Sequence, residues 1–328
     1  MLRIEQIPYS QNPCFFNKKC FIRQGTTNLE LAGEELIDFL KKRTLLNFEE
    51  SKTMASLQDL DLEKVKILLK RREIGTERLT EEVLKGILAG LHVANYSGDF
   101  FLKNVALLFF AKNPQKHLSN LEARIVKYAG IEADVGLIKL DKRLYGTIPE
   151  LITGVLRTVS ENIGKTFTLV GPERKEVLDY PNDSLREVIT NAFGHRDYSE
   201  SREVLIEIFE DHLQITNPGG LLGGQSVSNF DRTPQHRNPI CYRLLHDLGL
   251  GEGLGLGIRL IRRQFREARL PDPEFYNYGN VFQVIFYNRT SRRKRYATDF
   301  ENVRQKQALA YIEKNQRLNL SGLKAGGS

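Results

Sequence analysis

The stretch 184–198, SLREVITNAFGHRDY, constrains the fold of this chain more than any other part of its sequence. Its apolar residues recur at the i, i+3, i+4, i+7 and i+8 spacing of an amphipathic helix that packs on a larger body. These residues are Leu185, Val188, Ile189, Ala192 and Phe193. Glu187 and Asn191 are four residues apart, so they neighbour each other on one face of the helix. A carboxylate beside a carboxamide can hold a hydrated metal ion and orient a water molecule.

The start of the same helix offers Glu187 a second role. Residues 181–184 form a helix-start signal, and the spacing Ser184-x-x-Glu187 is that of a capping box, in which the glutamate accepts from a free backbone N–H. Capping does not explain Asn191, nor the polar and aromatic segment 195–198 that closes the helix. The capping role and the catalytic role of Glu187 are therefore both open at this point.

The Glu-x-x-x-Asn pair on a helix resembles the N box of the GHKL (Bergerat-fold) ATPases, which include gyrase B, the MutL proteins and the sensor histidine kinases. The fuller string in 187–198, E-x-x-x-N-A-x-x-H-R-D-Y, resembles a divergent branch of that superfamily. In that branch an ATPase-like domain follows a Schlafen-type AlbA domain, and members are often labelled transcriptional regulators or RecG-related ATP-dependent DNA helicases. The resemblance implies a multidomain α+β protein with a C-terminal Bergerat-type sandwich of helices on a mixed, mostly antiparallel sheet.

Two later segments resemble the other boxes of these ATPases. The segment 217–221, NPGGL, stands where the family has D-x-G-x-G, whose aspartate accepts the adenine amino group; Asn217 offers a neutral carbonyl instead. The segment 251–261, GEGLGLGIRLI, resembles the second glycine box, G-x-G-L-G-L. Glycines that open a helix let backbone N–H groups and the helix dipole meet a phosphate. The alternatives are a plain Pro-Gly turn and a purely structural glycine run.

The elements around these boxes follow from periodicity and turn signals. We expect helices over 149–162 and 240–248, a hairpin of strands 204–209 and 213–216, and a strand over 281–287. Residues 223–239 are polar and turn-rich, as expected of a lid over a ligand. The lid residues that could meet phosphate are Arg232, His236, Arg237 and Asn238.

The resemblance to the GHKL ATPases implies ATP and Mg²⁺ as ligands and assigns roles to the residues of the boxes. Glu187 would orient the attacking water, and Asn191 would hold the metal. The residues expected to contact the nucleotide are Asn191, His195, Arg196, Asp197, Asn217, Gly219, Arg237, Asn238, Gly253, Gly255 and Gly257. We expect slow hydrolysis at best, for three reasons: the adenine-box aspartate is replaced, no second acid or lysine is placed by the sequence to polarise a water, and the capping role competes for the Glu187 carboxylate.

The first 50 residues form the first expected domain, with strands over 2–7 and 20–23 and a helix over 32–42. The segment 21–27, FIRQGTT, followed by Glu34–Glu35–Leu36, resembles the closing strand, turn and last helix of a Schlafen-type AlbA domain. Such domains are linked to nucleic-acid binding, which implies a phosphate contact for Arg23; the alternative is a solvated arginine at a strand end. The acidic stretch of the family is absent upstream, so we assign no nuclease chemistry here.

Residues 51–145 are expected to form a connector domain, with helices over 59–72 and 80–94 and buried strands over 105–111 and 123–128. Thr80 is expected to cap the second helix. The strings D-L-D-L-x-K at 59–64 and F-A-K-N-P-Q at 110–115 resemble segments between the two named domains of the family. We assign no site to this region. The ATPase-like domain is then expected over 146–288.

The segment 289–328 is expected to be a basic linker and the start of a winged-helix-like segment. Five of the seven residues in 289–295 are basic and none is acidic, which suits a flexible arm that follows phosphates, although such runs are also found merely solvated. The expected nucleic-acid contacts of this run are Arg292, Arg293, Lys294 and Arg295.

Composition and a near-miss motif narrow the choice of function. A net charge of +7 permits a nucleic-acid partner, with DNA expected first. The three cysteines form no metal-type pair, and no apolar run approaches the ~20 residues of a membrane span, so we expect a cytoplasmic protein without membrane attachment. Gly164–Lys165–Thr166 is not a P-loop, because the glycine required five positions earlier is Val159.

The sequence therefore predicts an ATP-binding, nucleic-acid-associated regulator that forms homo-oligomers and uses its nucleotide site as a conformational switch. A nucleic-acid-binding module with a degenerate ATPase scaffold is the alternative from a different class. A Schlafen-type nuclease fragment is a further one, disfavoured by the missing acidic stretch. A histidine kinase is disfavoured because no pair of dimerising phospho-acceptor helices precedes the domain.

Overall fold

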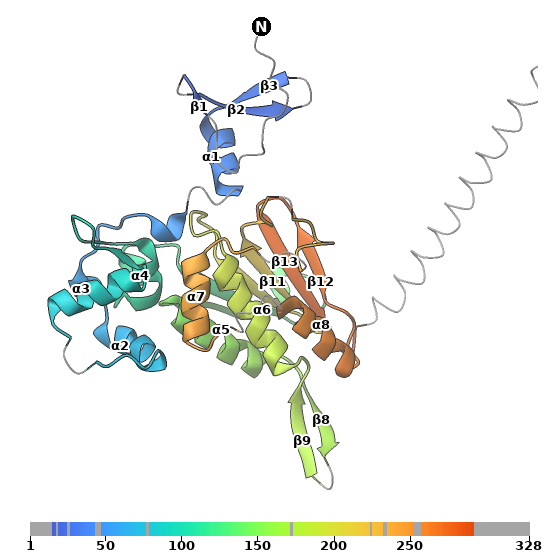
Figure 1. Ribbon diagram of the computed structural model, residues 1–328. Coiled ribbons are helices and arrows are strands. Elements are labelled where there is room, and N and C mark those ends of the chain that lie inside the picture. Colours follow the sequence, from blue (N-terminus) through green and yellow to red (C-terminus); the bar gives the residue numbers. More distant parts are fainter. Residues whose placement is uncertain are drawn as a thin grey trace, which may run out of the picture.

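The computed structural model describes most of the chain between residues 15 and 291 (Figure 1). The described ranges are 15–17, 19–24, 27–42, 47–76, 79–170, 173–223, 225–231, 235–251 and 257–291. The expected strand over 2–7, the lid residue Arg232, Gly253 and Gly255, and the basic residues Arg292, Arg293, Lys294 and Arg295 lie outside these ranges.

The N-terminal unit is a small antiparallel sheet followed by one helix. Its strands are β1 (Phe15–Phe16), β2 (Lys19–Gln24) and β3 (Thr27–Leu31), in the order β1-β2-β3, and its helix is α1 (Gly33–Lys42). The strand expected over 20–23 and the helix expected over 32–42 are confirmed. Arg23 lies in β2, where its backbone pairs with Asn28.

Short helices and a two-stranded sheet follow in residues 47–121. These elements are η1 (Phe48–Glu50), η2 (Leu57–Asp59), α2 (Leu62–Arg71), α3 (Glu81–Gly90), β4 (Ala94–Asn95), β5 (Phe101–Leu102), α4 (Asn104–Phe110) and η3 (Pro114–Lys116). Both expected helices are present, and Thr80 caps α3 by accepting the N–H of Val83 at 3.4 Å.

The prediction of a strand over 105–111 is wrong, because this segment is mainly the helix α4. Its side chains from Val105 to Ala111 are each no more than 1% exposed, so the helix is enclosed on every side. An amphipathic pattern marks a helix only when one face meets water. A fully buried helix and a fully buried strand both read as a continuous apolar run, and the run itself does not separate them.

A six-stranded sheet forms the centre of the remaining structure, in the order β12-β13-β11-β10-β6-β7. Its strands are β6 (Glu122–Tyr128), β7 (Ile138–Tyr145), β10 (Val204–Ile208), β11 (His212–Pro218), β12 (Glu274–Asn277) and β13 (Val281–Tyr287). Only β10 and β6 pair in parallel within it. The expected α+β class with a mixed, mostly antiparallel sheet is confirmed. Two of the six strands, β6 and β7, come from the segment that the sequence analysis allots to the connector.

Helices cover one face of this sheet (Figure 1). They are α5 (Ile148–Asn162), α6 (Asn182–His195), α7 (Pro239–Asp247) and α8 (Gly257–Glu267). A hairpin of β8 (Lys165–Val170) and β9 (Glu173–Leu178) projects away between α5 and α6 in the chain. Alternation along each strand turns the buried residues Leu213, Ile215 and Asn217 of β11 toward one face.

Helix α7, which belongs to the sheet unit, is hydrogen-bonded to the connector. Arg72, after α2, donates from Nε to the Asp247 carboxylate at 2.9 Å. Arg243 donates to the carbonyl of Leu91 at 2.8 Å. The buried side chains of both units form one contiguous hydrophobic core, so they are packed as a single body around this helix.

The N-terminus of α7 is held by a buried glutamate from far along the chain. Glu49, in η1, is completely buried, and its two carboxylate oxygens accept the backbone N–H groups of Ile240 at 2.9 Å and Cys241 at 2.7 Å. Burial raises the pKa of Glu49, while the hydrogen bonds from the two N–H groups act in the opposite direction. The interaction satisfies two N–H groups that a helix start leaves without an intrahelical partner.

Replacing Glu49 is expected to destabilise the protein strongly. Glu49→Ala leaves two buried N–H groups without an acceptor, which should lower the free energy of unfolding by about 3 kcal/mol. Glu49→Gln keeps one carbonyl acceptor and should lose less. The control is Glu50→Ala, whose half-exposed side chain pairs with Lys103 at 3.0 Å and should cost less than about 1 kcal/mol. Urea denaturation measures all three, and equal losses for the two alanine variants would contradict the capping role.

Candidate functional site

An open cleft lies between α6, the end of β11, the start of α7, the start of α8 and strand β13. It encloses about 990 Å³ when the open space at its mouth is counted. Its floor is apolar and includes Ile215, Phe282 and Val284, while Glu187, Asn191 and Asn217 place polar groups at separate points along it. The other lining residues are Val188, Ala192, His195, Gly219, Gly220, Leu221, Leu222, Gln225, Phe230, Asp231, Gln235, His236, Arg237, Tyr242, Gly257 and Ile258.

Glu187 and Asn191 face the cleft from consecutive turns of α6. Asn191 donates from Nδ2 to Glu187 Oε1 at 2.9 Å, and Glu187 is only 6% exposed. The capping alternative is overturned, because α6 begins at Asn182 after Pro181 and Glu187 stands in its second turn. Ser184, the other half of the expected capping box, donates to Gln264 Oε1 at 2.5 Å instead.

Gly257 opens α8 directly against the Glu187 carboxylate. A Cβ atom at this position would overlap the end of the Glu187 side chain, so any other residue here would displace the carboxylate from its present position. The backbone at the start of α8 therefore lies directly against the acid at the cleft. Of the three glycines expected to bind phosphate, Gly257 is the one within the described residues, and it lines the cleft.

Asn217 brings a hydrogen-bond acceptor to the wall of the cleft. It lies near the end of β11 and is 4% exposed, and its Oδ1 has no hydrogen-bond partner among the described residues. An unpaired buried acceptor costs about 1–3 kcal/mol. A ligand that donates a hydrogen bond at this point would remove that cost.

The two glycines after Asn217 are required by close contacts. Gly219 has a φ of +103°, and a Cβ on it would lie 3.0 Å from the backbone nitrogen of Asp197. A Cβ on Gly220 would overlap the carbonyl oxygen of Gly279 in the β12–β13 turn. The chain therefore turns directly after β11. Because Gly219 and Gly220 have no side chains, it is their backbone that lines this edge of the cleft.

Asp197 and Arg237 fasten the lid segment to this turn. Arg237 donates from Nη2 to the carbonyl of Gly220 at 2.8 Å, and its Nη1 lies 3.5 Å from Asp197 Oδ2. The other oxygen of Asp197 accepts from the backbone N–H of Ser199 at 3.0 Å. Arg237 lines the cleft, whereas Asp197 stands behind it and positions the arginine.

Three aromatic rings form one wall. His236 stacks on Tyr242 with ring centroids 3.7 Å apart, and His195 stacks on His236 at 5.5 Å. Burial, with smaller contributions from His236 and Arg237, lowers the pKa of His195 to about 4. Burial also lowers the pKa of His236. Both rings are neutral at pH 7, so they offer flat polar surfaces and no positive charge.

Arg196 and Asn238 do not line the cleft, although the sequence places both among the expected nucleotide contacts. The fully buried guanidinium of Arg196 donates to the carbonyls of Asn120 at 2.6 Å and Arg202 at 2.8 Å. Asn238 donates to the carbonyls of Gly194 and Arg196 at 3.1 and 2.8 Å. These contacts hold the end of α6 against its neighbours, and we leave both residues out of the proposed ligand site.

The sequence analysis missed several residues of the cleft. Phe230, Asp231, Tyr242 and Phe282 line it, and Asp231 pairs with Arg262 at 3.5 Å. One signal was available: Phe282 alternates with Val284 along β13, which places both on the ligand face. Within the described ranges, no group of three or more His, Cys, Asp or Glu side chains is arranged to hold a metal ion.

Comparison with known proteins relates the C-terminal part of the sheet unit, after α6, to one family. Residues 201–286 match the family model described as "Putative ATP-dependent DNA helicase recG C-terminal". The C-terminal domain is ATPase-like. The match covers β10, β11, α7, α8, β12 and β13, and it ends before the basic run at 292–295.

The fold as a whole is similar to that of the DIP2311 protein from Corynebacterium diphtheriae, known from a crystal structure, with a TM-score of 0.61 and 17% identity. The similarity covers 83% of this chain and 53% of that protein, so this chain spans about half of its length. No protein of curated function matches the chain. None of the helices in the described residues combines the length and apolar character needed to cross a bilayer.

Protonation of the cleft wall is expected to destabilise the fold in acid. The ordinary pKa of histidine is 6.5, and that of His195 is lowered to about 4. Between these values the unfolded chain takes up a proton that the folded chain refuses, so stability falls as the pH falls from 6.5 toward 4, by about 3 kcal/mol in total. His195→Gln should reduce this pH dependence, measured as thermal midpoints from pH 7.5 to 4.5. The exposed His246→Gln is the control; an unchanged profile in His195→Gln would contradict the assignment.

Proposed function

We propose that this protein is an ATP-binding, nucleic-acid-associated regulator whose ATPase-like domain serves as a conformational switch. One observation carries the proposal: Glu187 and Asn191 on α6, Asn217 on β11, Gly219 after it and Gly257 on α8 border the same cleft. The resemblance drawn from the sequence assigns these residues to one nucleotide site, and they come from segments up to about 70 residues apart.

The residues of the cleft fit an adenine nucleotide. Asn217 Oδ1 is a buried acceptor without a described partner, and adenine carries an amino donor. Asn191 gives its amide N–H to Glu187, which leaves its carbonyl oxygen for a hard cation such as Mg²⁺. Gly257 would bring backbone N–H groups to phosphate, together with Gly253 and Gly255 of the same box. Bound ATP with Mg²⁺ would supply a phosphoanhydride bond that a water held by Glu187 could attack.

The same chemistry makes hydrolysis slow. No lysine lines the cleft among the described residues. Its second acid, Asp231, is paired with Arg262. Glu187 does not cap α6, so slow turnover rests on the absence of these partners and on Asn217 in place of the adenine-box aspartate. The nucleotide would act mainly as a ligand that stabilises the closed position of the lid formed by 223–239.

Nucleic-acid binding and assembly complete the proposal. The matching family is described in terms of a DNA helicase, and the basic run Arg292, Arg293, Lys294 and Arg295 together with Arg23 would contact phosphates. We propose DNA as the partner, homo-oligomers as the assembly and the cytoplasm as the location. A second candidate is a nucleic-acid-binding module whose ATPase-like domain has lost its ligand; Asn217 in place of the family's aspartate favours it.

Adenine nucleotide binding is expected to depend on the acceptor at position 217. ATP with Mg²⁺ at 100 times its dissociation constant should stabilise the wild-type protein by about 2.7 kcal/mol. Asn217→Leu removes the acceptor and should weaken ATP binding by roughly 10-fold or more. Asn217→Asp can only accept at neutral pH, so it should raise the preference for ATP over GTP, whose base carries a carbonyl in place of the amino group.

Isothermal titration and thermal shift with ATP and GTP measure these effects. Asn191→Ala, which removes the proposed metal ligand, should weaken binding in Mg²⁺ and change it little in EDTA. The exposed Asn28→Ala, in the N-terminal unit, is the control. No heat and no shift with any adenine nucleotide would contradict the proposal and favour the degenerate scaffold.

Phosphate release is expected to be slow and to depend on Glu187. Steady-state turnover of the wild-type protein should lie far below the ~10 s⁻¹ that is typical of enzymes. Loss of a general base costs about 10²–10⁴-fold, so Glu187→Gln should bring turnover to background while ATP binding persists. Fast turnover that collapses in the variant would replace the switch by a working ATPase. Slow turnover that is unchanged in the variant would remove Glu187 from the catalytic role.

A further inference from the structure

Helix α8 carries a stripe of arginines on the face opposite the core. Its buried residues, Gly257, Ile261 and Phe265, recur every four positions. Arg259, Arg263 and Arg266 are exposed and recur at i, i+4 and i+7. Residues at these spacings lie on one face of a helix, and here that face is about 180° from Ile261. The three arginines therefore start from one line of about 10 Å along the outside of the helix. Arg259 also donates from Nη2 to the carbonyl of Asp231 at 3.4 Å, and Arg266 donates from Nε to the carbonyl of Arg262 at 3.2 Å, so both keep free N–H donors.

The charge of this surface is positive along the whole helix. Residues 257–269 contain five arginines and one acid, Glu267, which leaves a net charge of +4. Glu267 approaches Arg263 only at 3.9 Å with both side chains about two-thirds exposed, and such a pair neutralises little in water. The remaining arginine within the helix, Arg262, is turned to the side and paired with Asp231.

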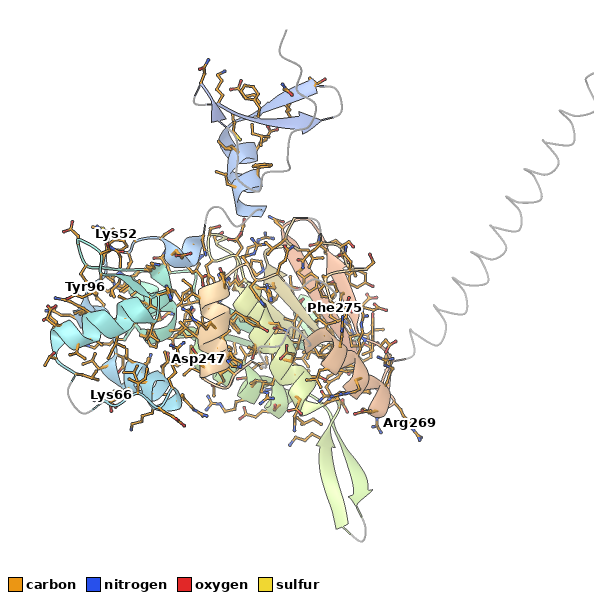
Figure 2. The ribbon with its side chains drawn as sticks, viewed as in Figure 1. Lys52, Lys66, Tyr96, Asp247, Arg269 and Phe275 are labelled. Atoms are coloured by element: carbon orange, nitrogen blue, oxygen red, sulfur yellow. The ribbon has the colours of Figure 1, made fainter. Side chains whose placement is uncertain are left out.

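The positive surface continues past the end of α8. Arg269 follows the helix at the outer edge of the domain (Figure 2). The exposed Arg289 donates to the carbonyl of Ala268, at the end of α8, at 3.2 Å, which ties the chain after β13 to this helix. The segment Arg292–Arg293–Lys294–Arg295 follows directly after Ser291 in the sequence.

We infer that the exposed arginine stripe of α8 binds the sugar–phosphate backbone of nucleic acid. Guanidinium groups bind phosphate with two parallel N–H donors, which suits arginine better than lysine to this contact, and the stripe contains arginine alone. A line of positive charges matches a linear polyanion. The contacts go to phosphates, so the binding is independent of base sequence and depends strongly on salt.

The packing of α8 argues against an anionic membrane as the partner. A helix that lies on a membrane inserts its apolar face between the lipids. The apolar residues Ile261 and Phe265 of α8 are fully buried in the domain core, and Phe265 packs on Phe286 with ring centroids 4.5 Å apart. Only the charged face of α8 is therefore accessible to a partner. A narrow stripe of charge fits a linear polyanion better than it fits the flat surface of a membrane.

The stripe is joined to the ligand cleft by the helix itself. The first residue of α8, Gly257, touches Glu187, and Gln264 in its middle accepts from Ser184 of α6. A ligand that moved the start of α8 would move the arginines with it. This inference deepens the proposed function and rests on its nucleic-acid partner, for which it names a contact surface that is separate from Arg23 and from the basic run.

The test compares two triple variants of the full chain that lose the same charge. In the first, Arg259, Arg263 and Arg266 of the stripe become Gln. In the second, Lys70, Arg71 and Arg157, exposed on α2 and α5, become Gln. Binding of a fluorescent 20-base-pair DNA duplex is followed by anisotropy at 50 to 200 mM salt. The stripe variant should bind at least about tenfold more weakly at the lowest salt, and its log–log salt slope should fall by up to about 3, while the control keeps both values.

Two further measurements separate the outcomes. A thermal shift with ATP and Mg²⁺ that is equal in the wild type and both variants shows that the cleft and the fold are intact. If the wild type binds DNA and the stripe variant binds it equally well, the inference fails while the proposed function stands. If the wild type binds neither DNA nor RNA, both fail. Stripe-dependent binding to vesicles of phosphatidylserine and phosphatidylcholine, without binding to DNA, would overturn nucleic acid in favour of a membrane.

Discussion

The two hydrogen bonds from the start of α7 to the buried carboxylate of Glu49 join parts of the protein that are about 190 residues apart in the chain. They fix the first turn of α7, and α7 in turn carries Tyr242 into the cleft and follows directly on the lid. Arg72 and Leu91 hold the rest of the helix against the connector. Glu49 therefore contacts the helix that borders the ligand site, and its neighbour Phe48 stacks on Tyr198, which follows α6, at 6.1 Å. A shift of α7 relative to Glu49 and the connector would break one of these contacts.

Helix α6 has to satisfy the core and the cleft at once. Its apolar stripe is buried on the sheet, and the same turns present Glu187 and Asn191 to the cleft, so the acid is positioned by packing and by its neighbour. Two glycines allow close packing around the cleft. A side chain at Gly257 would collide with Glu187, and a side chain at Gly220 would collide with the carbonyl of Gly279. Because no side chain stands at these two positions, the start of α8 and the turn after β11 lie close enough to α6 to contact the same small ligand. The buried histidine wall adds shape without charge.

The sequence pattern within single segments predicted many of these helices and strands. It failed at positions whose structure depends on contacts with distant parts of the chain. Strand β13 and the β10–β11 hairpin followed from alternation, and the helix of the motif followed from its stripe. Segment 105–111 was mistaken for a strand because total burial removes the helical period. The capping box at Ser184 was mistaken because the helix begins earlier than that signal. Glu49 carries no local signal, since its partners lie at the far end of the chain. Arg196 was grouped with the site by its place in the string, although its side chain turns toward Asn120.

The parallel pairing of β6 with β10 also governs the order in which this protein can be assembled during synthesis. Ala123 faces Val204, a separation of 81 residues (204 − 123), and every strand on the far side of β10 comes later still. The β6–β7 hairpin leaves the ribosome with one edge unpaired and keeps it so until β10 has been made. Helix α5 covers the apolar side of this hairpin in the meantime, since it follows β7 within three residues. The helix thus covers the apolar face of the hairpin, while the hydrogen-bonding edge of β6 stays open for as long as translation of the next 40 or so residues lasts.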